Sequence, residues 1–229
     1  MMIGIIGAMD EEIALLRKNM TEKVETAVAN CLFVHGKLFG RDVVLLKSGI
    51  GKVNAAMASA ILHERFTPSY IINTGSAGGF ADELEVGDIV ISSQVVHHDV
   101  DVTAFGYAYG QVPDMPAMYA ADTDLAARAG QAVKQLDIHF REGVIATSDS
   151  FMGNAAKVEA VKEKFPAMIA AEMEAAAIAQ VCYQYGTPFV VIRALSDIAG
   201  KQSSVSFDAF LETAAKNAAD LIMEMVKTL

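Results

Sequence analysis

MIAAEMEAAAIAQVCYQYGTPFVVIRALSD, residues 168–197, predicts a strand, a helix and a second strand in immediate succession. Residues 168–171 and 188–192 are short apolar runs of the kind that form buried strands. Residues 174–184, between them, have the length and composition of a helix. Strands that alternate with helices in this way build a parallel sheet covered by helices.

Charged residues follow both predicted strands. Glu174 follows the first run, and Arg193 and Asp197 follow the second. In open α/β sheets the carboxyl ends of the strands form the usual ligand crevice, so we expect these three side chains to share one site that handles polar groups and protons. Each alone could instead be a helix cap or a helix-end charge. Their convergence on one edge favours a site, because perturbed titratable groups gather where proteins function.

The same alternation extends along the chain in both directions. Runs typical of strands occupy 2–8, 43–47, 70–73, 89–96 and 143–147, and helical patterns occupy 11–20, 52–66, 125–136, 155–164 and 207–227. Residues 32–46 are the exception, since two runs flank Gly40-Arg41 as in a hairpin. The sequence therefore predicts a three-layer α/β/α fold with a mixed, mostly parallel central sheet.

Length and composition fit one α/β domain, expected to span residues 1–229. Of the 229 residues 53% are hydrophobic, which is enough for a full core. The formal charge of -10 argues against nucleic acid and anionic membranes as partners and leaves small molecules. Cys31 and Cys182 are expected to be reduced thiols. Residues 1–9 lack the basic segment of a signal peptide, so we expect a cytoplasmic protein.

Two glycine-rich segments have different predicted roles. Residues 49–53, GIGKV, lack the further glycine and the Ser or Thr of a phosphate-binding loop, which favours a tight turn between strand and helix. Residues 73–79, NTGSAGG, follow a predicted buried strand. There glycine lets the backbone approach a ligand closely and Ser76 offers a hydroxyl, so we expect a binding loop; a sharp turn is the alternative.

Three acidic residues, Asp10, Glu11 and Glu12, open the first predicted helix. A helix N-terminus that binds phosphate needs free backbone N–H groups and basic side chains, and carboxylates would repel the anion. A neutral water molecule could be held and deprotonated there, so the sequence favours hydrolysis over phosphorolysis. Stabilisation of the first helical turn explains Asp10 and Glu11 equally well and leaves Glu12 as the candidate base.

Metal and nucleophilic chemistry find little support. His97, His98 and Asp99 are suitable ligand types, but adjacent side chains of an extended segment point to opposite faces. No Gly-x-Ser-x-Gly motif marks a nucleophile. We therefore expect no metal and no other cofactor. Residues 99–122, rich in aromatic residues and proline, are expected to form a lid or an interface.

Six segments in this order resemble the 5′-methylthioadenosine/S-adenosylhomocysteine nucleosidase family, and the resemblance covers essentially the whole chain. The segments are GAMDEE (7–12), SGIGKV (48–53), NTGSAGG (73–79), DVTAFGY (101–107), EME (172–174) and RALSD (193–197). The resemblance implies a nucleoside phosphorylase-like fold, a homodimer, and irreversible cleavage of the adenine–ribose bond without a cofactor.

The resemblance also implies roles for individual residues. Asp197 would protonate adenine N7, Glu12 would activate the attacking water, and Glu174 would hold the ribose hydroxyls. The remaining contacts that it implies are Ser196 beside Asp197, Arg193 and Ser76 near the water and ribose, Phe151 stacked on the base, the Met152 backbone at the purine edge, Met9, Ile50, Met173 and Phe207 around the ribose and 5′-thio group, Ala77 and Gly78 as further substrate contacts, and Val102, Phe105 and Pro113 from the partner subunit.

Some expectations stay open. To deliver a proton near neutral pH, Asp197 needs a pKa well above the ordinary value of about 3.9 and therefore a desolvated pocket. Asp10 stands where the family often has Glu, and Met152 where a branched aliphatic residue is common. A phosphate-dependent phosphorylase and a non-catalytic nucleoside-binding protein remain alternatives. The preference among methylthioadenosine, S-adenosylhomocysteine, 5′-deoxyadenosine and futalosine-like nucleosides is not predicted.

Overall fold

A computed structural model describes residues 1–201 and 203–229, and in this part of the chain one eleven-stranded sheet is covered by helices. The strands are β1 (Met2–Gly7), β2 (Thr21–Val28), β3 (Cys31–Leu38), β4 (Arg41–Lys47), β5 (Tyr70–Asn73), β6 (Ser76–Gly79), β7 (Ile89–His97), β8 (Tyr119–Ala120), β9 (Phe140–Thr147), β10 (Met168–Glu172) and β11 (Phe189–Ile198). The helices are α1 (Asp10–Asn19), α2 (Lys52–Phe66), α3 (Thr123–Gln135), α4 (Ala155–Lys164), α5 (Ala175–Tyr185) and α6 (Ser203–Thr228), with a 3₁₀ turn, η1 (Thr103–Phe105).

The sheet is mixed, as the sequence predicts. Its order is β2-β3-β4-β1-β5-β11-β6-β10-β9-β7-β8, with an additional pairing of β11 and β7. Parallel ladders join β1 to β4 and β5, β11 to β5 and β6, and β9 to β7 and β10. The predicted hairpin of β3 and β4 is antiparallel, with Leu38 opposite Arg41. The carboxyl ends of β1, β4, β5 and β10 therefore lie near the middle of β11, where Val191 pairs with Asn73 and Ala194 pairs with Ser76.

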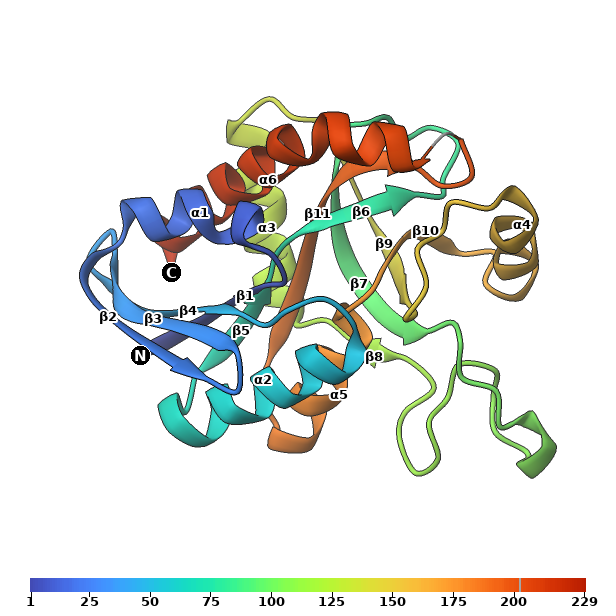
Figure 1. Ribbon diagram of the computed structural model, residues 1–229, viewed down its shortest axis with the longest axis horizontal. Coiled ribbons are helices and arrows are strands. Elements are labelled where there is room, and N and C mark those ends of the chain that lie inside the picture. Colours follow the sequence, from blue (N-terminus) through green and yellow to red (C-terminus); the bar gives the residue numbers. More distant parts are fainter. Residues whose placement is uncertain (202) are drawn as a thin grey trace.

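Helices cover both faces of the sheet and make three layers (Figure 1). Residues of α1, α3 and α6 pack on one face in a cluster that includes Leu16, Val133 and Ile222. Residues of α2 and α5 pack on the other face with Leu62 and Ile178. Both sets of helices pack on strands whose side chains are buried on both faces of the sheet, which explains why these strands are continuous apolar runs.

The strand that contains the charged residues is longer than predicted. We expected the apolar run 188–192 to end at Arg193, but β11 continues through Asp197 to Ile198. Its first half pairs with β5, and its second half pairs with β6 and β7. The second half was not predicted because Arg193 and Asp197 are polar, whereas a buried strand is expected to be a continuous apolar run.

Further elements also differ from the prediction. Residues 76–79 of the predicted binding loop form the short strand β6, and β2 was not predicted because its residues are almost all exposed and lack an apolar face. The helix predicted at 174–184 begins after Glu174, which is its N-cap residue. Helix α6 begins at Ser203 and not at residue 207.

Two features bear on chemical environment. No helix in the described residues is long and apolar enough to cross a membrane. Cys31 and Cys182 are buried free thiols, as expected. Burial raises the pKa of Cys182 to about 12, so this thiol stays protonated and unreactive.

Candidate active site

A cavity of about 360 Å³ opens at the edge where β1, β4, β10 and β11 end. It collects side chains from the β1–α1 turn, the turn before α2, β6, the segment after β10, β11 and the start of α6. The residues that line it are Ala8, Met9, Glu12, Ile50, Ser76, Ala77, Gly78, Phe151, Ala171, Glu172, Met173, Glu174, Ser196, Asp197, Phe207 and Asp208. Most of the residues singled out from the sequence lie in this wall, although they come from segments far apart in the chain.

Glu12 is buried and held by donors from two segments. Its Oε2 accepts hydrogen bonds from the backbone N–H groups of Ala8 at 2.7 Å and Met9 at 3.2 Å. Its Oε1 accepts from Ser76 N at 3.0 Å and from Ser76 Oγ at 3.2 Å. A Cβ at Gly75 would lie 2.7 Å from Oε1, so only glycine permits this approach. The carboxylate is thus fixed at the cavity wall.

The other two acidic residues of the first turn have a different environment. Asp10 and Glu11 are exposed, and Asp10 pairs with Lys47 at 2.8 Å. Their position at the start of α1 suits the helix dipole. Of the three acids in this turn, Glu12 is therefore the one placed to act in the cavity.

Arg193 lies beneath the cavity and not in its wall. It is 1% exposed, and its Nη2 donates to Glu172 Oε2 at 2.6 Å and to Asn73 Oδ1 at 2.7 Å. Thr147 Oγ1 donates to the other oxygen of Glu172. Burial opposes the charge of Arg193, but the surrounding carboxylates of Glu172, Glu174 and Glu12 outweigh it and raise the arginine pKa.

Glu172 has a structural role that our sequence analysis did not assign. Its Oε2 also accepts from the backbone N–H groups of Glu174 at 2.9 Å and Ala175 at 2.8 Å, and so caps the start of α5. The signal was present in the sequence, because Glu172 stands two residues before Glu174 at the end of the same strand. Its partner could not be chosen from spacing alone.

Glu174 is buried beside this charged network. Its Oε1 accepts from Gly51 N at 2.8 Å. Gly51 has φ of 95°, and a Cβ there would lie 3.1 Å from Asp149 Oδ1, so the turn before α2 needs glycine. Burial, followed by the charge of Glu172, raises the pKa of Glu174 to about 8. The free carboxyl group therefore holds its proton at neutral pH.

Asp197 faces the cavity from β11. It is 2% exposed, and Ser196 Oγ donates to its Oδ1 at 3.0 Å. A Cβ at Gly78 would have its closest contact, 3.1 Å, with Asp197 Oδ2. The carboxyl group therefore lies against the backbone of β6, next to the hydroxyl of Ser196.

Apolar side chains complete the cavity wall. The rings of Phe151 and Phe207 meet edge to face, with centroids 6.0 Å apart and planes at 78°. Met9, Ile50 and Met173 lie in the same wall. The Met152 side chain instead packs in a buried cluster with Phe165, and its carbonyl accepts from Gly200 N at 3.2 Å. The difference from a branched residue at position 152 therefore affects the core around Phe165.

Val102, Phe105 and Pro113 do not line this cavity. They belong to the segment between β7 and β8, which extends away from the sheet (Figure 1). Phe105 is 82% exposed. Within one chain the exposed Phe105 ring therefore has no part in the cavity.

The raised pKa of Glu174 predicts how stability depends on pH. The pKa rises from an ordinary 4.5 to about 8 on folding, so the folded protein binds this proton more tightly and loses stability as pH rises from about 4.5 to 8. Glu174→Gln should remove this loss and raise the Tm of the ligand-free protein at pH 9 by about 5 °C, with little change at pH 4. Scanning calorimetry across this range measures it, with the exposed Glu212→Gln as control. Parallel pH profiles for wild type and Glu174→Gln would contradict it.

Comparisons with known proteins agree with the geometry. The model of the phosphorylase superfamily matches residues 2–227. The 5′-methylthioadenosine/S-adenosylhomocysteine nucleosidases of Oceanobacillus iheyensis and Bacillus subtilis are 65% and 55% identical, each over 99% of both chains. The enzyme of the same name from Neisseria meningitidis, solved with methylthio-immucillin-A, is 47% identical with a TM-score of 0.98, covering 100% of this chain and 99% of that one. The futalosine hydrolase of Helicobacter pylori is 33% identical with a TM-score of 0.94, covering 100% and 98%. The chain therefore belongs to the phosphorylase superfamily and, within it, to the 5′-methylthioadenosine/S-adenosylhomocysteine nucleosidases, which are N-glycosyl hydrolases.

Proposed function

We propose that this chain hydrolyses the N-glycosidic bond of 5′-methylthioadenosine and S-adenosylhomocysteine and releases adenine and the 5-thio-substituted ribose. One observation carries the hydrolytic part of the proposal: among the described residues, the cavity wall holds several carboxyl groups and no Lys, Arg or His side chain. Water can be bound and deprotonated in such a cavity, whereas a phosphate anion would lack a cation.

Glu12 and Asp197 divide the proton transfers. Cleavage of the C1′–N9 bond leaves its electron pair on adenine and positive charge on the ribose ring. Asp197 gives its proton to adenine N7, and Ser196 orients the carboxyl group by its hydrogen bond. Glu12 takes a proton from water as the oxygen adds to C1′. In the net reaction, one nucleoside and one water molecule give adenine and the 5-thio-substituted ribose.

The remaining polar groups position the ribose and the water. Glu174 binds the ribose hydroxyl groups, and its carboxyl oxygen is already aligned by Gly51 N. Ser76 lies between Glu12 and the cavity. The resemblance implies a place near the water and ribose for Arg193, but this side chain lies beneath the wall and supports the site through its ion pair with Glu172 at 2.6 Å.

The apolar groups hold the two ends of the substrate. Phe151 stacks on adenine, and the Met152 backbone lies at the purine edge. Phe207, whose ring meets that of Phe151, belongs to the wall around the ribose and 5′-thio group. Met9, Ile50 and Met173 contact the ribose and the 5′-sulfur, which suits a thioether because it is apolar and polarisable. We assign Ala77 and Gly78 of β6 to the floor beneath the base.

We also propose a homodimer in which Val102, Phe105 and Pro113 of each subunit close the 5′ end of the neighbour's cavity. The exposed Phe105 ring, on a segment that extends from the body, supports this assignment. Residues 1–229 would act as one domain in a reducing, cytoplasmic environment, in keeping with two buried free thiols.

Asp197→Asn should lower kcat by about 10²- to 10⁴-fold, because an amide can hydrogen-bond adenine N7 but cannot deliver a proton. Adenine release measures turnover, and calorimetric titration with adenine checks that the site still binds. A variant that keeps most of the wild-type turnover would show that another group is the acid.

Adenine release should proceed in phosphate-free buffer at the rate found with phosphate. The reason is the absence of a basic side chain from the cavity wall of the described residues. Chromatography of the products distinguishes free thioribose from a sugar 1-phosphate. A requirement for phosphate would establish a phosphorylase, and binding without adenine release would establish a sensor. Methylthioadenosine, S-adenosylhomocysteine, 5′-deoxyadenosine and a futalosine-like nucleoside form the test panel.

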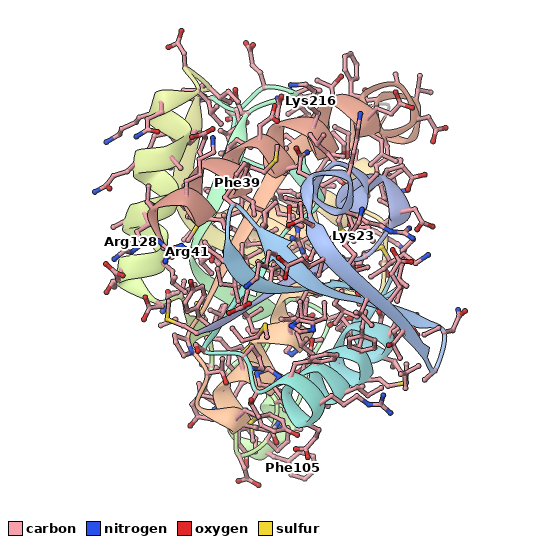
Figure 2. All side chains as sticks on the ribbon, turned by 90° about the vertical axis from the view of Figure 1, so that its left-hand side faces the viewer. Lys23, Phe39, Arg41, Phe105, Arg128 and Lys216 are labelled. Carbon is pink, nitrogen blue, oxygen red and sulfur yellow. The ribbon has the colours of Figure 1, made fainter. Side chains whose placement is uncertain are left out.

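Phe105→Ala should weaken binding of nucleosides with a 5′-thio substituent about tenfold to a hundredfold and leave adenine binding unchanged. The substitution removes about 1.5–3 kcal/mol of apolar contact only at that substituent. Phe39→Ala is the control, since Phe39 is also an exposed aromatic residue and lies far from Phe105 (Figure 2).

A mixed dimer tests where Phe105 acts. One subunit carries Asp197→Asn with Phe105 intact, and the other carries Phe105→Ala with Asp197 intact. Active sites of the second subunit should regain normal substrate affinity because they receive Phe105 from the first. Affinity that stays low, or full activity of a monomer in sedimentation, would contradict the shared pocket.

A further inference from the structure

A second hollow adjoins the catalytic cavity. It has a volume of about 430 Å³, and it shares Met9 and Ile50 with the cavity wall. Its other sides carry polar groups, among them Asp10, Lys47 and Asn54. Ala8, Met9 and Ile50 line both hollows, so the polar compartment is the nearest hollow to a group that leaves the cavity beside Met9 and Ile50.

The polar compartment is lined by one basic residue, Lys47, and two acidic residues, Asp10 and Glu11, and Lys47 and Asp10 lie side by side. Lys47 Nζ lies 2.9 Å from Asp10 Oδ1 and 2.8 Å from Asp10 Oδ2. Both groups are accessible, with 28% of the Lys47 side chain and 69% of the Asp10 side chain exposed. An exposed ion pair of this kind contributes little free energy. Each side chain can therefore leave its partner and pair with an oppositely charged group of a ligand at a small cost in free energy.

The neighbouring turn is fixed in a way that keeps the compartment open. Asn54 Nδ2 donates to Ile50 O at 2.7 Å and holds the turn that carries Ile50. Gly49, which also lines the compartment, has φ of 83° and no side chain to fill it. The compartment is therefore already present in the folded chain, and the turn does not need to move to form it.

The two proposed substrates differ only in the group on sulfur. Methylthioadenosine has a methyl group, whereas S-adenosylhomocysteine has a chain that ends in an α-ammonium and an α-carboxylate group. Under the assignment above, Met9 and Ile50 flank the sulfur. The longer chain must then leave the apolar cavity beside these two residues, where its charged end cannot stay dry.

We propose that the compartment binds the zwitterionic amino-acid end of a 5′-thioether nucleoside, with Lys47 facing the carboxylate and Asp10 facing the ammonium group. This inference rests on the proposed function. It gives the chain a subsite that S-adenosylhomocysteine fills and methylthioadenosine does not reach. Lys47 and Asp10 are then specificity-determining residues, and they act on binding and not on bond cleavage.

The test compares four nucleosides on the full-length Lys47→Gln and Asp10→Asn variants. The nucleosides are methylthioadenosine, S-adenosylhomocysteine, an analogue whose 5′-thio chain ends in a carboxylate only, and one whose chain ends in an ammonium group only. Lys47→Gln should raise KM about threefold to tenfold for the carboxylate analogue and S-adenosylhomocysteine. KM for the ammonium analogue should stay equal or fall. Asp10→Asn should give the converse with the two analogues.

Methylthioadenosine is the internal reference, and kcat should be unchanged for all four nucleosides. Lys37→Gln is the matched control, because Lys37 also forms an accessible ion pair, with Asp42 at 2.9 Å, but lies outside both hollows. In the wild type, KM for S-adenosylhomocysteine should rise with salt while KM for methylthioadenosine stays constant.

The outcomes separate the subsite from the hydrolytic activity. Equal changes for all four nucleosides, or none, would overturn the subsite while the hydrolase assignment stands. Indistinguishable behaviour of Lys37→Gln and Lys47→Gln would overturn the subsite as well. Failure of the wild-type protein to release adenine from any of the four would overturn the proposed function itself.

Discussion

The buried ion pair of Arg193 and Glu172 is the contact on which the rest of the site depends. It joins the middle of β11 to the end of β10, and Asn73 and Thr147 add the ends of β5 and β9. Such a pair gains little net stability over apolar packing, but either member alone would leave an unpaired charge in the core. The same Glu172 oxygen accepts from the backbone N–H groups of Glu174 and Ala175, so one carboxylate holds both the strand contact and the start of α5 at Ala175.

This arrangement gives neighbouring carboxyl groups different chemistry. Glu172 has an arginine and several other donors, so its charge is compensated where it stands. Glu12 has four donors at its two oxygens. Glu174 is equally buried but has one backbone donor and the charge of Glu172 nearby, and its pKa rises to about 8. Environment, and not residue type, therefore sets Glu174 apart from the two carboxyl groups beside it.

Some parts of the fold could be predicted from the sequence and others could not, and the difference has a physical cause. The three layers and the β3–β4 hairpin could be predicted from apolar periodicity, because strands that are buried on both faces are continuous apolar runs in the sequence. The second half of β11 has no such run, since Arg193 is buried there with side-chain partners that are 120 and 21 residues away in the sequence. The same limit applies inside the site. The grouping of Glu174, Arg193 and Asp197 follows from strand ends, but the placement of Arg193 beneath the cavity, and the part played by Glu172, depend on which donor meets which acceptor across the sheet.

The fold by itself does not choose between hydrolysis and phosphorolysis, since function resides in the site that a fold carries. The choice depends on what stands at the start of α1 and α2. The N-terminus of α2 is tied to other segments: Lys52 N donates to Asp149 at 2.8 Å, and Lys52 Nζ binds Asp99 at 2.6 Å. Asp99 begins the segment that carries Phe105, and Gly51, next to Lys52, holds Glu174. A displacement of this helix end would therefore move the Glu174 carboxyl group and the segment that carries Phe105 together.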